Sequence, residues 1–190
     1  MLPLASAVSL PGDGRFELRA YEPRDKKAVG ILRAVAHHEE PTPEWEKPPS
    51  DALPHHTVVV AEVQEGEARG RVVAAARIIV TEPHLAHLQF MCVEEGLRGR
   101  GLGSALLRWV DLTSRDACGA RHVELEVDRG NVRAQELYAR NGYAHTPEHS
   151  AAARAWFDNP AIRRMLGAPR VLRYLKPLPR ETQTGAEDTP

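Results

Sequence analysis

The stretch Arg98-Gly99-Arg100-Gly101-Leu102-Gly103-Ser104 joins an apolar run, residues 88–93, to an amphipathic run, residues 102–117. This order predicts a strand, a short loop and a helix that begins with glycines. Backbone N–H groups in the first turn of a helix have no partner within the helix, and they carry partial positive charge. Glycines let a ligand approach that backbone closely, and the two arginines add bidentate donors. The stretch therefore predicts a phosphate site, and a pyrophosphate site in particular.

Two other phosphate-binding patterns fit this stretch poorly. A P-loop needs a Gly-Lys pair, which the sequence does not contain. A dinucleotide-binding fingerprint needs G-x-G-x-x-G after the first strand, whereas the glycines here fall at 99, 101 and 103 and follow several strand-like segments. A regulator that binds ATP or NAD through this loop stays open as an alternative.

A second stretch, residues 131–143, reads NVRAQELYARNGY and predicts a helix. Asn131 is a suitable N-cap after the strand-like run 123–127. Asn141-Gly142 is typical of a left-handed helix stop. Apolar side chains between these two ends recur at helical spacing, at Ala134, Leu137 and Tyr138.

Together the two stretches resemble the GNAT superfamily, the GCN5-related N-acetyltransferases. The [QR]-x-x-G-x-[GA] motif of that family matches Arg98, Gly101 and Gly103, and its N-x-x-A-x-x-L-Y-x-x-x-G-[FY] signature matches residues 131–143. The resemblance covers roughly residues 16–143. It implies an α/β (mixed α+β) GNAT fold, in which helices flank a mixed, mostly antiparallel sheet of about seven strands with splayed fourth and fifth strands.

The resemblance also implies the cofactor, acetyl-CoA as acyl donor, and no metal. Loop amides would hold the pyrophosphate, and the pantetheine arm would enter the splay and use the backbone of the fourth strand. The implied cofactor-binding residues are Met91, Cys92, Val93, Arg98, Gly99, Arg100, Gly101, Leu102, Gly103, Ser104, Asn131, Ala134 and Tyr138.

Acetyl transfer to an amine requires a base, a donor to the developing oxyanion and an acid for the leaving thiolate. Tyr138 is the predicted acid, because a phenol is protonated at neutral pH and the family uses the matching Tyr; a purely packing role is the alternative. The resemblance implies the backbone N–H of Val93 as the donor to the oxyanion. His87 falls where some family members place a glutamate, and it shares a strand face with Val93 if no bulge intervenes. Glu126 and Glu124 on the next strand are rival bases.

The wider pattern predicts one domain over residues 15–179, preceded by a loose segment, 1–14, and followed by a disordered tail, 180–190. Expected helices cover about 23–38, 101–117 and the segment after Asn131. Expected strands cover about 16–21, 57–63, 71–81, 85–93, 123–127, 143–146 and 171–178, and residues 147–169 form an insert with helical character.

Composition narrows the functional class. The net charge of −1 argues against a nucleic-acid binder, and the chain has no apolar run long enough for a membrane span. Two cysteines, Cys92 and Cys118, have no metal spacing and fit a reducing cytoplasm. The N-terminus lacks a positively charged region, so we do not expect a signal peptide. Paired histidines such as His37-His38 carry no metal-binding spacing either.

The acyl acceptor is the least determined part. The resemblance implies that residues 37–54 and 147–170 build its site. The first holds Trp45 among several carboxylates, which favours a cationic amine, and the second holds Arg154, Trp156 and Phe157. We expect a small-molecule amine and a monomer or homodimer. A protein or peptide N-acetyltransferase and a low-turnover acyl-CoA-binding sensor domain remain alternatives.

Overall fold

The computed structural model describes residues 6–10, 14–37, 56–146 and 171–179. Their strands form one sheet in the order β1-β2-β3-β4-β5-β6-β8-β7. The strands are β1 (Ser6–Leu10), β2 (Gly14–Ala20), β3 (His56–Val63), β4 (Val72–Glu82), β5 (Leu85–Val93), β6 (His122–Asp128), β7 (Ala144–Thr146) and β8 (Val171–Pro177). The mixed, mostly antiparallel sheet that the sequence predicted is confirmed, with β5 and β6 as its parallel pair.

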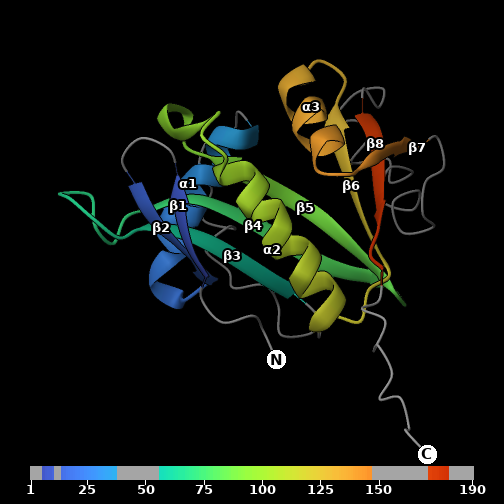
Figure 1. The fold of residues 1–190 in the computed structure, drawn as a ribbon, viewed down its shortest axis with the longest axis horizontal. Helices are drawn as coiled ribbons and strands as arrows, with labels where there is room; N and C mark the ends of the chain where they lie inside the picture. The colour runs from blue at the N-terminus through green and yellow to red at the C-terminus, as the bar shows by residue number, and fades with distance from the viewer. Residues whose placement is uncertain (1–5, 11–13, 38–55, 147–170, 180–190) are drawn as a thin grey trace, which may run out of the picture.

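Helices lie on both faces of this sheet (Figure 1). Helix α1 (Lys26–His37) follows a 3₁₀ turn, Pro23–Asp25, and covers one face. Helices α2 (Leu102–Asp116) and α3 (Val132–Arg140) lie on the other. Beside α1 the core is small and includes Leu32, Phe90 and Cys92.

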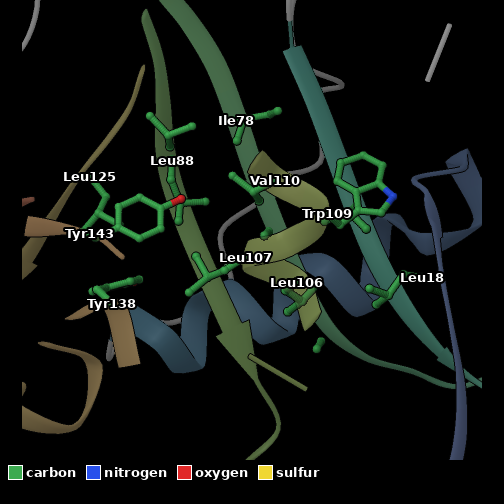
Figure 2. Packing of buried hydrophobic residues seen from close by; sticks show 14 of the residues in the cluster. Leu18, Ile78, Leu88, Leu106, Leu107, Trp109, Val110, Leu125, Tyr138 and Tyr143 are labelled. Atoms are coloured by element: carbon green, nitrogen blue, oxygen red, sulfur yellow. The ribbon is translucent and has the colours of Figure 1, made fainter. Parts of the chain in front are cut away.

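The larger core lies between the sheet and α2 (Figure 2). The side chains that this helix turns toward the sheet are buried, among them Leu102, Leu106, Trp109, Val110 and Thr113. They recur every three to four residues, which places them on one helix face. Packing against the sheet therefore fixes where α2 begins, and with it the loop of residues 98–101.

At one end of the sheet, a buried ion-pair cluster ties β2 and β3 to the start of α1. The Arg19 guanidinium donates to both carboxylate oxygens of Asp25, at 2.7 and 2.8 Å, and also to Glu62. Asp25 in turn accepts from the Glu22 backbone N–H at 2.8 Å. Burial alone would raise the pKa of Asp25, but the hydrogen bonds from Arg19 and Glu22 hold it below its usual value.

Asp25→Asn is expected to lower the free energy of unfolding by about 3 kcal/mol, since it leaves a buried guanidinium with one carboxylate fewer. Because the pKa of Asp25 is lower in the folded state, its stabilisation is present above pH ~4 and is lost as the pH falls further. Urea unfolding at pH 7 and pH 3 measures both effects. Glu65→Gln, in the exposed pair with Arg15, is the control and should change little. An equal loss of unfolding free energy in both variants would contradict a specific stabilising role for the buried Arg19–Asp25 pair.

One part of the structure differs from the sequence-based expectations. Residues 6–10 form strand β1, paired antiparallel to β2 from Ser6↔Leu18 to Leu10↔Gly14, where the sequence predicted a loose segment over 1–14. The short run SAVSL has little alternation of its own, so its backbone pairing with β2 decides its conformation. Strand β8 lies between β6 and β7, which places the last strand inside the sheet.

Several expectations fall outside the described residues. These are the proline-rich segment with Trp45, the insert over 147–169 and the tail over 180–190. No helix in the described part of the chain has the length and apolarity that a membrane span requires.

Candidate active site

The predicted phosphate loop adopts the backbone that its glycines permit. Gly99 and Gly101 have φ values of 83° and 95°, in the left-handed region that other residues rarely adopt. Gly101 is the N-cap of α2, and no side chain caps the helix there. The first-turn N–H groups of α2 therefore have no side-chain acceptor at the cap, as expected of an anion site.

The two arginine positions of the loop differ in what the structure shows. Arg98 Nε donates to the Val93 carbonyl oxygen at 2.9 Å, so this side chain joins the loop to the end of β5. Arg100 is exposed. A third arginine, Arg133 in the first turn of α3, lies beside the loop: a Cβ added to Gly99 would be 3.3 Å from its Nη2. Sequence reasoning missed Arg133, although it lies inside the second motif, two residues after Asn131.

Close packing of α2 on α3 explains the remaining loop residues. A Cβ at Gly103 would lie 3.0 Å from Leu137 Cδ2, so this glycine lets the two helices approach. Ser104 Oγ accepts a hydrogen bond from Asn141 Nδ2 at 3.1 Å. As predicted, Asn131 caps α3, its side chain accepting from the Ala134 backbone N–H at 3.1 Å. The second motif thus positions the first.

Strands β5 and β6 separate after a short parallel contact. Their register runs from Leu85↔His122 to Leu88↔Leu125, whereas β5 stays paired with β4 as far as Val93. Figure 1 shows the two strands diverging from that contact. The β6-facing backbone edge of residues 89–93 is therefore not paired with β6. This divergence is the predicted splay, with β5 and β6 as the strands that the sequence analysis called the fourth and fifth. The diverging part of β5 contains the three predicted pantetheine positions, Met91, Cys92 and Val93.

Tyr138 lies on the α2 face of the sheet, in the core beside β6 (Figure 2). Its ring centroid is 6.0 Å from that of Tyr143 and 6.2 Å from that of Tyr174. Burial raises the pKa of Tyr138 to about 12, so the phenol stays protonated through the neutral range. Among the described residues, no hydrogen bond engages its hydroxyl. Tyr143, by contrast, donates to Asp111 Oδ1 at 2.7 Å.

A bulge in β5 decides which face His87 occupies. The register with β4 passes from Ile78↔Leu88 to Arg77↔Phe90, so Gln89 is an extra residue. Val93 then packs with the α2-side core, together with Ala86 and Leu88. His87 alternates with those two and points to the α1 face. The condition for a shared face of His87 and Val93, an unbulged strand, is therefore not met, and the two side chains lie on opposite faces.

On the α1 face, the three candidate bases, His87, Glu124 and Glu126, lie in one polar cluster. His87 Nδ1 lies 3.3 Å from Glu124 Oε1, and Glu124 Oε2 accepts from Arg173 Nη2. Glu126 is on the same face of β6, one step beyond the last β5–β6 residue pair. Its Oε1 atom is buried and has no hydrogen-bond partner in the described part of the chain. The structure thus brings His87, Glu124 and Glu126 together and adds Arg173, which the sequence analysis did not single out.

The pKa of Glu126 is raised above its usual value. Burial is the largest cause, and the neighbouring Glu124 adds to it, while His87 and Arg173 act in the opposite direction. A carboxyl with a raised pKa at the start of a strand splay is a candidate proton acceptor. Within the described residues, no group of three or more metal-ligating side chains occurs.

The functional elements therefore lie on both faces of the sheet. Tyr138 lies in the core on the α2 side, and His87 and Glu126 lie on the α1 side, while the glycine loop joins the end of β5 to α2. The two segments expected to contact the acceptor, residues 37–54 and 147–170, fall almost entirely outside the described residues.

Comparisons with known proteins agree with this geometry. The family model described as "Acetyltransferase (GNAT) family" matches residues 23–143, which include the glycine loop, the splay and the Tyr138 helix. No curated protein matches the chain in sequence.

Solved structures with this fold are numerous. The GNAT domain of PAT from S. lividans has a TM-score of 0.64 at 17% identity, covering 92% of this chain and 97% of that one. A GNAT-family acetyltransferase from Staphylococcus aureus has a TM-score of 0.63 at 16% identity, covering 86% and 99%. A mutant spermidine N-acetyltransferase from Vibrio cholerae has a TM-score of 0.61 at 18% identity, covering 85% and 94%. At these identities the similarity shows the fold.

Proposed function

This chain belongs to the GNAT family of acetyltransferases, and from that premise we propose that it transfers an acetyl group from acetyl-CoA to a primary amine. The amine would attack directly while both substrates are bound. One observation carries the proposal: β5 and β6 diverge in a sheet that has a buried phenol, Tyr138, in the core on one face and two possible proton acceptors, His87 and Glu126, on the other. A thioester in the splay would have an acid on one side and a base on the other.

The described residues fit coenzyme A. The uncapped N-terminus of α2, entered through Gly99 and Gly101, offers backbone N–H groups to a pyrophosphate, and Arg100 and Arg133 add charge beside it. The β6-facing edge of Met91–Val93 offers backbone groups to the amides of the pantetheine arm. When bound, acetyl-CoA supplies an activated carbonyl carbon as the electrophile.

The protein's own side chains then divide the proton transfers. His87 or Glu126 accepts the proton that the attacking amine loses, and Tyr138 Oη donates to the leaving sulfur. The backbone N–H of Val93 is the proposed donor to the carbonyl oxygen as negative charge develops there. Burial of Tyr138 excludes water from the donor, which strengthens its hydrogen bond to a thiolate.

For the acceptor we propose a small-molecule amine. Supporting this, one similar structure is a spermidine N-acetyltransferase, and the segment around Trp45 carries several carboxylates that would attract a cation. The free thiols of Cys92 and Cys118 fit a cytoplasmic enzyme, and we propose that it acts as a monomer or homodimer. A protein or peptide acceptor and a low-turnover acyl-CoA sensor are the other candidates.

The first experiment compares thermal unfolding with acetyl-CoA, CoA, ATP and NAD. A ligand that binds only the folded state raises the free energy of unfolding by mass action, by about 2.7 kcal/mol when its concentration is 100 times its Kd. The unfolding temperature rises with it. We expect a shift with acetyl-CoA and CoA only. A shift with ATP or NAD in their place, or with none of the four, would refute the cofactor assignment.

Turnover separates the remaining candidates. Release of free CoA thiol is followed with spermidine, amino acids and a peptide N-terminus as acceptors. Fast release with one small amine supports the proposed acceptor class, whereas release with the peptide alone supports a protein acetyltransferase. Affinity for acetyl-CoA without release across the panel supports the sensor.

A further inference from the structure

The carboxylate that contacts His87, that of Glu124, is almost fully buried. Glu124 has 1% of its side chain exposed, and Arg173 has 6%. The His87 side chain is 16% exposed and meets Glu124 from the neighbouring strand. Buried charges are retained in proteins where they are paired, and here one carboxylate contacts a guanidinium and an imidazole through different oxygens.

The sheet register brings these three side chains together from separate parts of the chain. His87 and Glu124 are direct neighbours in the parallel contact of β5 and β6. On the other side of β6, the residue opposite Arg173 is Glu126, while Glu124 is opposite Leu175. Arg173 therefore reaches diagonally to Glu124, a distance that long side chains span across antiparallel strands. This choice of partner leaves Oε1 of Glu126 unbonded among the described residues.

An ionised carboxylate can only accept hydrogen bonds, so its contact with His87 selects one ring tautomer. The Arg173 guanidinium stabilises Glu124 as the carboxylate. The neutral imidazole would then carry its proton on Nδ1, directed at Glu124 Oε1, and would present the lone pair of Nε2. In the described part of the chain, Glu124 is the one hydrogen-bond partner of this ring.

We propose that Glu124, held by Arg173, is a positioning residue that fixes His87 as the Nδ1–H tautomer and leaves Nε2 to accept the proton of the amine. This inference rests on the acetyl transfer proposed above and chooses His87 as the proton acceptor. In this proposal the neighbouring Glu126 does not accept the proton, and its carboxyl group contributes only to the electrostatic environment of His87.

The atoms of the proposed step balance. The amine nitrogen forms a bond to the carbonyl carbon and loses one proton to His87 Nε2, which gives an imidazolium beside the Glu124 carboxylate. The carbon–sulfur bond breaks, and the sulfur takes a proton from Tyr138. Solvent returns a proton to Tyr138 and removes one from His87, so the net change moves one proton from nitrogen to sulfur.

The charges around the ring come from every element packed on this face. Strand β6 contributes Glu124 and Glu126, β8 contributes Arg173, and β4 contributes Arg77, on the same face as Phe90. The strand residue directly beside His87 on β4 is the apolar Ile79. From α1, Arg33 lies one turn after Val29, which packs on this face of the sheet. Glu124 is the group among these for which a hydrogen bond to the ring is found.

The test measures the ring nitrogens directly. In ¹⁵N-labelled wild-type protein without any ligand, long-range ¹H–¹⁵N spectra above pH 8 report the tautomer of each histidine, and the spectrum of His87→Gln assigns the His87 signals. We expect protonated Nδ1 and unprotonated Nε2 at His87. Protonated Nε2 would overturn the proposal. Because no cofactor is present, this result is independent of acetyl transfer.

Glu124→Gln then tests whether the carboxylate acts on the reaction. Losing a negative charge about 3–4 Å from the imidazolium should move the acidic limb of the kcat/KM–pH profile down by about 1 pH unit or more. Asp111→Asn is the matched control: it removes a carboxylate that accepts from Lys176 of β8 at 2.6 Å and from Tyr143, on the opposite face. It should lower the unfolding temperature without moving the limb.

An acidic limb that stays in place in a folded Glu124→Gln variant would overturn the positioning role. If the variant does not fold, the wild-type tautomer decides the proposal alone. Failure of the proposed function has a different signature: CoA release would be absent with every amine, whatever the tautomer of His87.

Discussion

Tyr138→Phe is expected to lower kcat by about 10²-fold, with little change in the affinity for acetyl-CoA. The variant keeps the ring and its packing against Tyr143 and Tyr174, and it removes only the hydroxyl that would donate to the leaving sulfur. Because burial raises the pKa of this phenol to about 12, the donor stays protonated at all pH values where the amine reacts readily. Single-turnover rates with saturating acetyl-CoA measure the chemical step, and a thermal shift with CoA measures binding.

Tyr174→Phe is the matched control, because it removes a hydroxyl from another buried tyrosine of the same core, one ring away. We expect its kcat to stay within about twofold of wild type. If Tyr138→Phe retained the wild-type rate, the residue would have a packing role only, and the acid would have to be another group or water.

Gly101→Asp is expected to raise the Kd of CoA by about 10²-fold or more. The new carboxylate would sit at the N-cap of α2, where the pyrophosphate is proposed to bind. Two like charges about 4 Å apart repel by roughly 1–4 kcal/mol at effective dielectric constants between 80 and 20. Calorimetric titration with CoA measures the change.

The substitution also places a side chain at a φ of 95°, so its effect on folding needs a separate control. Gly70→Asp puts the same residue at a φ of 84° in the turn between β3 and β4, where a Cβ meets nothing within 4 Å. We expect a comparable loss of stability there and an unchanged Kd. Wild-type affinity in folded Gly101→Asp would refute the phosphate site.

The parts of the fold that the sequence predicted are those fixed by local pattern. Apolar spacing places Leu106 and Val110 in the core, and the glycines of the loop have the conformations that only glycine adopts readily. Asn131 caps its helix because an amide three residues along is within reach of its side chain. Each of these features depends on residues within about one helical turn.

The parts that it did not predict depend on pairing across the sheet. Strand β1 exists because β2 offers it an edge, and the face of His87 depends on a bulge opposite β4. The contact of Arg173 with Glu124 joins residues 49 positions apart, and nothing near either residue signals it. Arg133 was missed for another reason: its position is variable within the motif, so the pattern assigns it no role.

The parallel contact of β5 and β6 has a mechanical consequence. It comprises four residue pairs and is the seam between two antiparallel units, β1–β5 and β6–β8–β7. Each unit has its own antiparallel ladders, and the seam has fewer residue pairs than the β4–β5 and β6–β8 ladders on either side of it. We therefore expect the two units to separate at the seam, as at a hinge. A ligand that contacts both units would oppose their separation. We therefore expect amide hydrogen exchange at residues 85–88 and 122–125 to slow when it binds.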